Sequence, residues 1–359
     1  MAAAFRMIDT GLRSGRANIS LDQAMIDARS AGEIGDTLRF ISFEPCVLVG
    51  RHQAVAQEVQ LEYCRANGIE VGRRITGGGT IFMNQGVLGW ALVCDKRALG
   101  TASLAEITQR VCEAAARGLS MLGFPARFRP RNDIEVEGRK LCGTGGFFDG
   151  DIMIYQGTVL GQLDPQVMLS ALNVPRAKLE KRGLDDASKR VVTLKELTGA
   201  APDWAAVKRA LAQAFSEDLG ITLTPDVMSD AETARADELF QTEIGTDDFV
   251  YEINDPARDA SVHTGQVSTP GGLVAAHVRV EGATSRLIRE VLFTGDFFVA
   301  PPRIVMDLES SLRGIRIEAM RQHIREFFAG TGAAGLLSIA PDSFADAIES
   351  AVAELEGAP

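Results

Sequence analysis

The sequence has no long hydrophobic run, few histidines and no excess of positive charge. No apolar stretch approaches the roughly 20 residues that a membrane-spanning helix needs, so we expect no membrane contact. The formal net charge of −11 argues against a general nucleic-acid-binding protein, because phosphate binding needs a positive surface. The four histidines, at positions 52, 263, 277 and 323, show no metal-ligand spacing.

The cysteines are widely separated and form no CxxC motif. Each lies in an apolar or helical setting, so we expect buried free thiols, which suit a reducing cytoplasm. Residues 1–6 are too short for the apolar part of a signal peptide. We therefore expect a cytoplasmic protein. The five cysteines are Cys46, Cys64, Cys94, Cys112 and Cys142.

The chain is long enough for two domains. Its 359 residues exceed the length at which a single hydrophobic core keeps growing. The composition, 46% hydrophobic and 24% charged, is ordinary for a globular protein. We expect a first domain over residues 1–225, an acidic linker over 226–260, and a smaller α/β domain over 261–359.

Helix and strand signals are mixed along the first domain. Ser20 is a candidate N-cap for a helix over 21–28, Ser103 begins a capping box that opens a longer helix, and a third helix begins at Pro202 or Asp203. Strand-like segments between them connect as hairpins around glycine-rich turns. The pattern predicts an α+β fold in which helices pack on a mixed, largely antiparallel sheet.

The most informative segment is a glycine-rich turn that follows two arginines, over residues 73–80. Glycine tolerates positive φ and lets a ligand approach the main chain closely. The exposed N–H groups can bind an anion, and the arginines can pair with its charge. Strand-like segments flank the turn, which favours a binding loop on a rigid sheet; a long hairpin turn is the alternative.

A second segment, residues 130–146, again combines strand, turn and glycine-rich loop. Asp133 could hold a magnesium ion, Asn132 could bind a base or ribose, and Lys140 could reach a phosphate. Lys140 lies in a strand-like segment between a turn and a second glycine cluster. That setting favours a functional lysine over a solvated surface residue.

Together these motifs resemble those of the lipoate–protein ligase family, which shares its catalytic fold with the biotin protein ligases. The family pattern runs Arg-Arg-x-Ser/Thr-Gly-Gly-Gly, Arg-Asn-Asp, Gly-Arg-Lys, then Gly-Thr-Leu/Val-Leu. The chain matches it in that order at residues 73–79, 131–133, 138–140 and 157–160. The ordered set is specific, although each motif alone is weak. Residues 290–298 are similar to the accessory domain of the two-domain ligases.

The resemblance implies that ATP activates lipoate as lipoyl-AMP and that the lipoyl group is then transferred to a lysine of a lipoyl-carrier protein. ATP and Mg²⁺ are the implied cofactors, with Asp133 as the metal ligand and Lys140 as the catalytic residue. The implied acceptor is a lipoyl domain of a 2-oxoacid dehydrogenase or a glycine-cleavage-H-like protein. The implied substrate- or adenylate-binding residues are Arg74, Thr76, Gly77, Gly78, Gly79, Thr80, Asn132, Asp133, Gly143, Thr144, Gly157 and Thr158.

The resemblance also assigns the larger parts of the chain. Residues 1–225 would be the catalytic domain and 261–359 the accessory domain. A loop over 178–190 would close over the adenylate and keep water out. We expect a monomer.

Two departures from the family pattern lie near the implied acyl site. Met83-Asn84 stands where the family usually has His-Asp, and Tyr155-Gln156 stands where it usually has His-His. Met83, Gln156 and Lys178 are therefore possible pocket residues. Because the lysine and nucleotide motifs are intact, we expect adenylation to be retained and the acyl or acceptor specificity to be altered.

Two other classes of function stay open. An octanoyl- or lipoyl-transferase of the same fold would work through an acyl-thioester on a cysteine, without ATP. Cys142, two residues after Lys140, is the only cysteine near the implied site. A non-catalytic lipoyl-carrier-binding protein is the third class, and an intact Lys140 argues against it.

Overall fold

The computed structural model describes residues 3–101, 103–130, 132–173, 190–282, 286–331, 335–336 and 338–356. The chain divides into two compact units. Unit 1 comprises Met1–Leu48, Val59–Arg73 and Ile81–Val250, and unit 2 comprises Val49–Glu58, Arg74–Thr80 and Tyr251–Pro359. The glycine-rich turn therefore makes its contacts within unit 2, although it connects two strands of the N-terminal half.

In the described residues, unit 1 is built on an eight-stranded sheet with the order β11-β1-β2-β6-β10-β9-β8-β7. β1 runs parallel to β2 and β11, and the other five pairs are antiparallel. The predicted mixed, largely antiparallel sheet is confirmed. The strands are β1 (Ala3–Arg13), β2 (Asp36–Phe43), β6 (Val87–Asp95), β7 (Arg127–Arg129), β8 (Asp133–Val136), β9 (Arg139–Asp149), β10 (Ile152–Leu160) and β11 (Ile221–Pro225).

A smaller sheet, ordered β4-β3-β5, carries the ends of the glycine-rich turn. Its strands are β3 (Cys46–Val49), β4 (Glu70–Arg73) and β5 (Ile81–Met83). The turn leaves β4 at Arg73 and enters β5 at Ile81, as the strand-like flanks predict.

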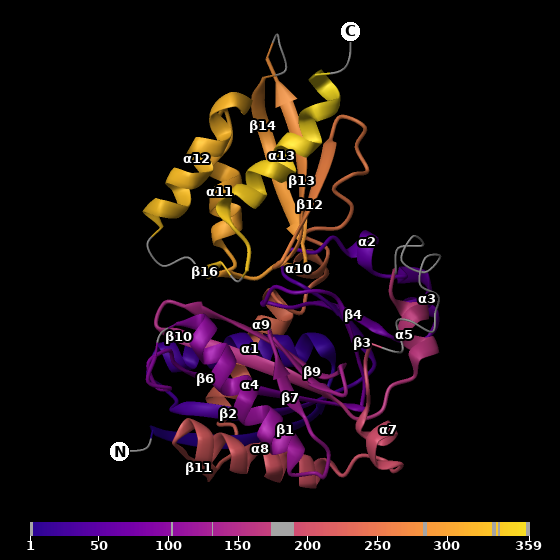
Figure 1. The fold of residues 1–359 in the computed structure, drawn as a ribbon, viewed down its shortest axis with the longest axis vertical. Coiled ribbons are helices and arrows are strands. Elements are labelled where there is room, and N and C mark those ends of the chain that lie inside the picture. Colours follow the sequence, from indigo (N-terminus) through magenta and orange to yellow (C-terminus); the bar gives the residue numbers. More distant parts are fainter. Residues whose placement is uncertain are drawn as a thin grey trace. The chain divides into compact units, whose positions relative to one another are not determined.

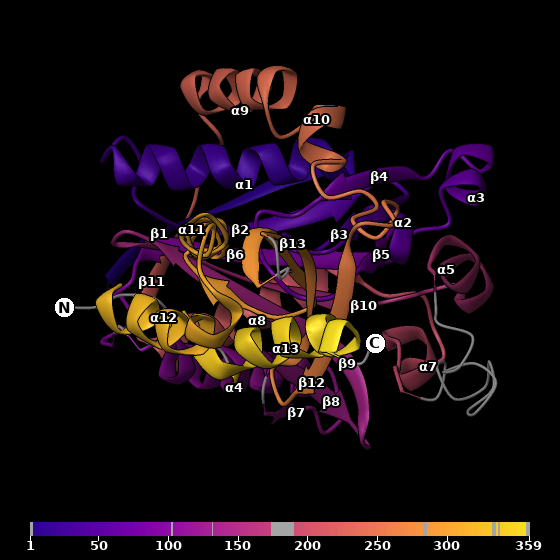
Figure 2. The same ribbon diagram turned by 90° about the horizontal axis from the view of Figure 1, so that it is seen from above.

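Helices cover both faces of the large sheet (Figure 2). One face carries α1 (Gly15–Ser30) with α9 (Asp230–Thr242) beside it, and the other carries α4 (Leu104–Ser120) and α8 (Trp204–Leu219). The main core lies between the sheet and the second helix pair, where the rings of Trp90 and Phe215 are 5.1 Å apart. The shorter helices are α2 (Val55–Glu58), α3 (Leu61–Ala66), α5 (Pro165–Ala171), α7 (Leu194–Thr198) and α10 (Asp247–Val250).

Two of the three predicted helix starts are confirmed, and of the alternatives Pro202 and Asp203 it is Asp203 that caps its helix. The side chains of Ser103 and Asp203 accept backbone hydrogen bonds at the starts of α4 and α8. Ser20 is wrong as a cap: the helix begins earlier, with Ser14 as its N-cap. Ser20 lies buried in the second turn and its hydroxyl donates to the Arg16 carbonyl at 2.9 Å, so a local bond inside the helix replaced the predicted cap.

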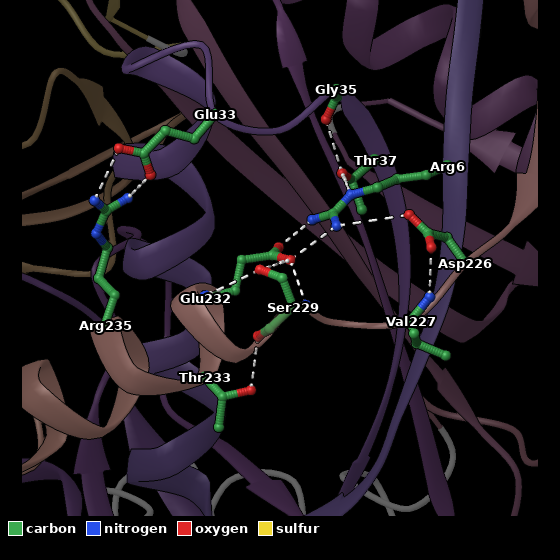
Figure 3. Close-up of polar contacts among 10 residues, drawn as sticks. All are labelled: Arg6, Glu33, Gly35, Thr37, Asp226, Val227, Ser229, Glu232, Thr233 and Arg235. Atoms are coloured by element: carbon green, nitrogen blue, oxygen red, sulfur yellow. Dashed lines mark hydrogen bonds and ion pairs between the residues drawn. The ribbon is translucent and has the colours of Figure 1, made fainter.

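Helix α9 falls in the segment that we expected to be a linker, and a buried ion pair attaches it to the sheet (Figure 3). Arg6 of β1 donates two hydrogen bonds to Glu232, whose side chain is only 3% exposed. Glu232 also completes a capping box with Ser229. A second pair, Arg235 with Glu33, is much more exposed.

We predict that Glu232→Ala destabilises the protein much more than Glu33→Ala. Removing Glu232 leaves the mostly buried Arg6 guanidinium with only the more distant, exposed carboxylate of Asp226 as an anionic partner, which costs about 3 kcal/mol, whereas loss of the exposed pair costs less than about 1 kcal/mol. Urea unfolding of both variants measures the difference. Equal losses of unfolding free energy in the two variants would show that the buried Arg6–Glu232 pair stabilises the protein no more than the exposed pair does.

Unit 2 packs three helices on an antiparallel sheet, which confirms the predicted smaller α/β unit (Figure 1). Its core contains Phe293, Phe297 and Phe344, whose rings meet edge to face. In the described part of the chain no helix is both long and apolar enough to cross a membrane. The elements are β12 (His263–Thr269), β13 (Gly272–Glu281), β14 (Leu287–Gly295), β15 (Val299–Ala300), β16 (Gly335–Leu336), α11 (Ile304–Ser311), α12 (Ile317–Gly330) and α13 (Pro341–Glu356).

Glu309 of α11 is an acidic side chain held in poor contact with water. It accepts a 2.7 Å hydrogen bond from the Phe293 backbone N–H. Burial raises the pKa of Glu309 to about 8, and the charge of Glu252 adds to this, while the Phe293 hydrogen bond and Arg51 oppose it. The folded protein therefore keeps this carboxyl protonated at pH values where the unfolded chain has lost the proton.

We predict that the contribution of Glu309 to stability is lost as pH rises from about 4.3, the ordinary pKa of glutamate, to about 8. In that window the native state binds one proton more than the unfolded state, so ionisation opposes folding. Glu309→Gln keeps the acceptor oxygen and should flatten this slope, raising Tm at pH 8 relative to wild type. Glu318→Gln, at an exposed position of the same unit, is the control. An unchanged slope in Glu309→Gln would contradict the assignment.

Candidate active site

One face of strands β9 and β10 is partly open. Gly143 and Gly145 of β9, with Gln156 and Thr158 of β10, are half-buried, whereas their immediate chain neighbours are buried. The register pairs Gly145 with Gln156 and Gly143 with Thr158, so the four residues share one face. We call these four residues the glycine strip. Because two of them have no side chain, a ligand can lie directly against the backbone.

Lys140 brings its amino group to the glycine strip. A Cβ atom on Gly143 would lie only 2.6 Å from both Cε and Nζ of Lys140, so this glycine makes the space for the side chain. The Lys140 N–H donates to the Arg190 carbonyl at 2.8 Å, and its carbonyl accepts from Val192 at 2.9 Å. The backbone is therefore fixed, while the side chain is 37% exposed. This is the setting that the sequence predicts for a functional lysine.

Asp133, at the start of β8, lies between two cations. Its Oδ1 is 2.8 Å from Lys140 Nζ, and its Oδ2 is 2.7 Å from a guanidinium nitrogen of Arg129. Burial acts to raise the pKa of Asp133, but Lys140 and Arg129 outweigh it and hold the pKa below its ordinary value. Asp133 is thus ionised at neutral pH. Among the described residues, no three His, Cys, Asp or Glu side chains gather into a metal site.

Hydrogen bonds between Asn132 and Thr144 hold the start of β8, next to Asp133, against β9. The Asn132 side chain donates to the Thr144 carbonyl, and the Thr144 N–H donates to the Asn132 carbonyl at 2.9 Å. On the core side, the Thr144 hydroxyl is 2.8 Å from the Tyr155 hydroxyl and 3.2 Å from the Cys112 sulfur. These contacts fix the turn that carries Asp133.

Three other predicted site residues have different surroundings. Gly157 lies against Trp90, whose ring would be 2.3 Å from an added Cβ atom. Thr158 lies on the glycine strip and its hydroxyl is 3.5 Å from the Gly143 carbonyl. Met83 is buried in β5, where it pairs with Cys46. Gly157 therefore lies on the core face and Thr158 on the open face of the same strand.

The two arginines beside the glycine-rich turn bind backbone carbonyls. Arg73, in unit 1, donates to the carbonyls of Phe249 and Val250. Arg74, in unit 2, donates to the Gly77 carbonyl at 3.0 Å and the Gly79 carbonyl at 2.9 Å. Burial lowers the pKa of Arg74 to about 10, so it is still cationic at neutral pH. Arg74 holds the turn in shape and places a positive charge inside it.

The glycines of the turn are required by close packing within unit 2. A Cβ atom on Gly77 would lie 2.4 Å from the Phe297 carbonyl oxygen. Gly78 has a φ of +93° and its N–H donates to the same carbonyl at 3.2 Å. The Thr76 carbonyl accepts from the Arg51 N–H, and the Thr80 hydroxyl is 2.8 Å from the Gln53 side chain. The turn has a well-defined conformation before any ligand is considered.

Three charged residues near the strip were not among the sequence candidates. Arg129 pairs with Asp133, and Asp22 of α1 pairs with Arg39 of β2 on the same face of the sheet as the strip. A signal was present for Arg39, because an arginine inside the apolar strand segment 38–41 needs a buried partner. The predicted pocket residue Lys178 lies outside the described residues.

None of the five cysteines has the surroundings of a reactive thiol. All are buried, and burial raises the pKa of every one of them. The pKa of Cys142 rises to about 12, with Lys140 opposing the shift only in part. Its sulfur lies on the core face of β9, opposite to the glycine strip. A thiolate nucleophile needs a lowered pKa and access to substrate, and Cys142 has neither.

The fold is that of the biotin/lipoate protein ligase class. P. falciparum LipL1, solved in complex with lipoate, has a TM-score of 0.69 at 16% identity and covers 91% of this chain and 94% of that one. A chain from a study of a bi-partite lipoate protein ligase and its E2 lipoyl domain from Thermoplasma acidophilum gives a TM-score of 0.62 at 24% identity, covering 70% and 97%.

Sequence comparison then identifies the family. The chain belongs to the lipoyl protein ligase A/B catalytic domain family, whose model matches residues 14–216. The octanoyltransferase LipM of Kyrpidia tusciae is 29% identical over 258 residues, or 66% of this chain and 94% of that protein. A probable lipoate-protein ligase A of Mycoplasma genitalium is 26% identical over 291 residues, or 78% and 80%. The resemblance stated from the motifs is thus confirmed, and the relatives include both transferases and ligases.

Proposed function

We propose that this protein is an ATP-dependent lipoate–protein ligase that activates lipoate as lipoyl-AMP and transfers the lipoyl group to a lysine of a lipoyl domain. The observation that carries the proposal is the contrast between Lys140 and the cysteines. The lysine amino group lies on an open strip of backbone, whereas every thiol is buried with a raised pKa. This contrast favours an acyl-adenylate over an acyl-thioester route.

The first half-reaction brings two anions together. A carboxylate oxygen of lipoate attacks the α-phosphorus of ATP, and pyrophosphate leaves. Positive charge and hydrogen-bond donors at the reacting groups lower this barrier. Lys140 is the group that we assign to the acyl carboxylate and α-phosphate, with Asp133 and Arg129 holding it in place. Open backbone at Gly143 and Gly145 leaves room for the mixed anhydride.

Magnesium would arrive with ATP as part of the substrate. Asp133 is ionised and is the carboxylate that we assign to it. Both of its oxygens contact cations, Lys140 and Arg129, so Asp133 would hold a magnesium ion only with further oxygen ligands from the nucleotide phosphates. The residue therefore fits the metal only together with the nucleotide.

The other predicted site residues take supporting roles in this proposal. Arg74, Thr76, Gly77, Gly78, Gly79 and Thr80 would bind the adenylate through the glycine-rich turn, and the loop that contains Lys178 would cover it. Residues 1–225 would form the catalytic domain and 261–359 the accessory domain. One solved relative was studied with its E2 lipoyl domain, which supports a lipoyl domain as the acceptor.

The relatives named octanoyltransferase support a second candidate, transfer from an acyl-thioester donor without ATP. Three incubations with a lipoyl domain separate the two candidates. The first contains lipoate and MgATP, the second contains lipoate without ATP, and the third contains an octanoyl-carrier thioester in place of ATP and lipoate. We expect modification only with ATP. Modification by the thioester donor alone would favour the transferase.

We predict that Lys140→Met abolishes lipoyl-AMP formation while the fold persists. Methionine keeps much of the volume but removes the charge that stabilises the transition state, a loss of about 10²- to 10³-fold. Lys208→Met, which removes a lysine paired with Asp9 at the surface, is the matched control. A folded Lys140→Met variant that forms adenylate at the control rate would remove Lys140 from the mechanism.

Cys142→Ser should keep most of the activity. The Cys142 sulfur donates only a weak 3.6 Å contact to the Gly143 carbonyl, which a serine hydroxyl can replace. An ATP-driven route also requires no thiol. The measurement is the rate of lipoyl-domain modification, with intact-mass analysis of the enzyme. An acyl adduct on Cys142 combined with an inactive serine variant would place the protein among the thioester-forming transferases.

A further inference from the structure

Gln156 is connected to a buried ion pair on the same face of the sheet as the glycine strip. Its side-chain Nε2 donates to Asp22 Oδ2 at 2.6 Å, and Asp22 Oδ1 lies 2.5 Å from a guanidinium nitrogen of Arg39. The exposed fractions of the Asp22 and Arg39 side chains are 1% and 0%. The Arg39 guanidinium also donates to the side chains of Asn18 and Thr10. Gln156 is the member of this network that reaches the open face.

Sheet register explains how one carboxylate reaches both partners. Arg39 pairs with Ala91, Ala91 with Gln156, and Gln156 with Gly145, so the four lie in a row across β2, β6, β10 and β9. Ala91 separates Arg39 from Gln156 and has only a methyl side chain. Asp22, from α1 above this face, therefore spans the small residue and binds the groups on either side.

The ion pair determines which end of the Gln156 side-chain amide points away from Asp22. Burial raises the pKa of Asp22 and Arg39 opposes this; protonation would leave a buried guanidinium without its counter-charge, so we assign the carboxylate as ionised. An ionised carboxylate only accepts hydrogen bonds, so Nε2 must be the atom that faces it. Oε1 then points away from Asp22, and within the described residues it accepts no hydrogen bond.

The open face thus presents a donor and an acceptor at separate places. Lys140 Nζ lies over Gly143, in the row of Thr158. Gln156 is two residues from Thr158 along β10, a separation of about 6.6 Å between backbones. The Lys140 amino group can bind carboxylate or phosphate oxygens. A fixed carbonyl acceptor requires a donor, and an apolar acyl tail would leave it unpaired at a cost.

We propose that Gln156 binds the attacking amine of the acceptor lysine in the second half-reaction, with Asp22 as its positioning residue. This inference rests on the proposed ligase function. The amine nitrogen forms the new C–N bond to the acyl carbon, and the C–O bond breaks with its electrons leaving on AMP. The amine releases one proton to water. Gln156 accepts a hydrogen bond from the amine and takes no proton, because an amide is too weak a base.

The test separates the two half-reactions. Lipoyl-AMP prepared chemically is supplied with a recombinant lipoyl domain, and transfer is timed apart from lipoyl-AMP formation from lipoate and MgATP. We expect Gln156→Met to slow transfer by about 10- to 100-fold, the effect of one hydrogen bond to a charged or reacting group, and to leave adenylate formation near the wild-type rate. Gln213→Met is the matched control, because Gln213 also donates to a carboxylate but lies on the surface of α8.

A second variant gives a readout that a merely structural role would not produce. In Gln156→His, a neutral imidazole could donate to Asp22 and accept from the amine, whereas the imidazolium could not accept. The charged groups facing this position are Asp22 from α1, Arg39 from β2 and, one row away over Gly143, the Lys140 amino group from β9; the residues paired directly with it are Ala91 and Gly145. Transfer should therefore fall as pH drops through the histidine pKa, and adenylate formation should show no matching inflection.

Three results overturn the inference. The first is equal slowing of both half-reactions in Gln156→Met. The second is a raised KM for ATP in Gln156→Met with unchanged transfer, which would indicate that a nucleotide hydroxyl is the donor. The third is transfer by Gln156→His whose rate shows no inflection with pH. Failure of the proposed function is distinguishable. In that case wild type forms no lipoyl-AMP from ATP, yet transfer from the supplied adenylate still depends on Gln156. Circular dichroism of each variant excludes unfolding as the cause.

Discussion

The position of the Lys140 amino group depends on the absence of a side chain at Gly143. Any larger residue there would lie within 2.6 Å of the lysine terminus and displace it. The same absence of side chains exposes the backbone on which a substrate can lie. The glycines therefore leave room both for the substrate and for the positive charge of Lys140 beside it. Asp133 and Arg129 then hold the amino group at one end of the strip. A protein with a net charge of −11 can therefore offer an anion a positive site, because the cations are concentrated locally.

The opposite face of the same strands explains why the site is rigid. Tyr155 and Gly157 alternate with Gln156 and Thr158, and the first two pack into the core against Cys112 and Trp90. From Tyr155 onward every second residue of β10 is thus committed to packing, which leaves Gln156 and Thr158 on the open face. Between α1 and the sheet, the Asp22–Arg39 ion pair also contributes to the rigidity of the site. Its burial is costly unless its hydrogen bonds are satisfied, and Gln156 supplies one of them.

Much of this arrangement could be predicted from local sequence signals. The caps at Ser103 and Asp203 and the strands around the glycine motifs follow from short-range patterns, and the same patterns make Lys140 a candidate functional residue. Ser20 was wrong as a cap because Ser14 caps the helix six residues earlier and the Ser20 hydroxyl bonds within the helix. Long-range pairings left no local trace: neither the Gln156–Asp22 bond nor the packing of Gly77 against Phe297 could be inferred from spacing. The sheet register creates these contacts, and a single sequence does not specify register between residues 134 positions apart.

The central claim is that acyl transfer proceeds through a mixed anhydride with AMP. Lipoate labelled with ¹⁸O in its carboxylate tests it directly, because the oxygen that attacks the α-phosphorus stays on phosphorus when the amine later breaks the acyl C–O bond. After reaction with MgATP and a lipoyl domain, the released AMP is analysed by mass spectrometry. The account predicts one ¹⁸O atom in each AMP formed and one AMP for each modified lysine. Lysine modification without AMP, or with unlabelled AMP, would contradict it.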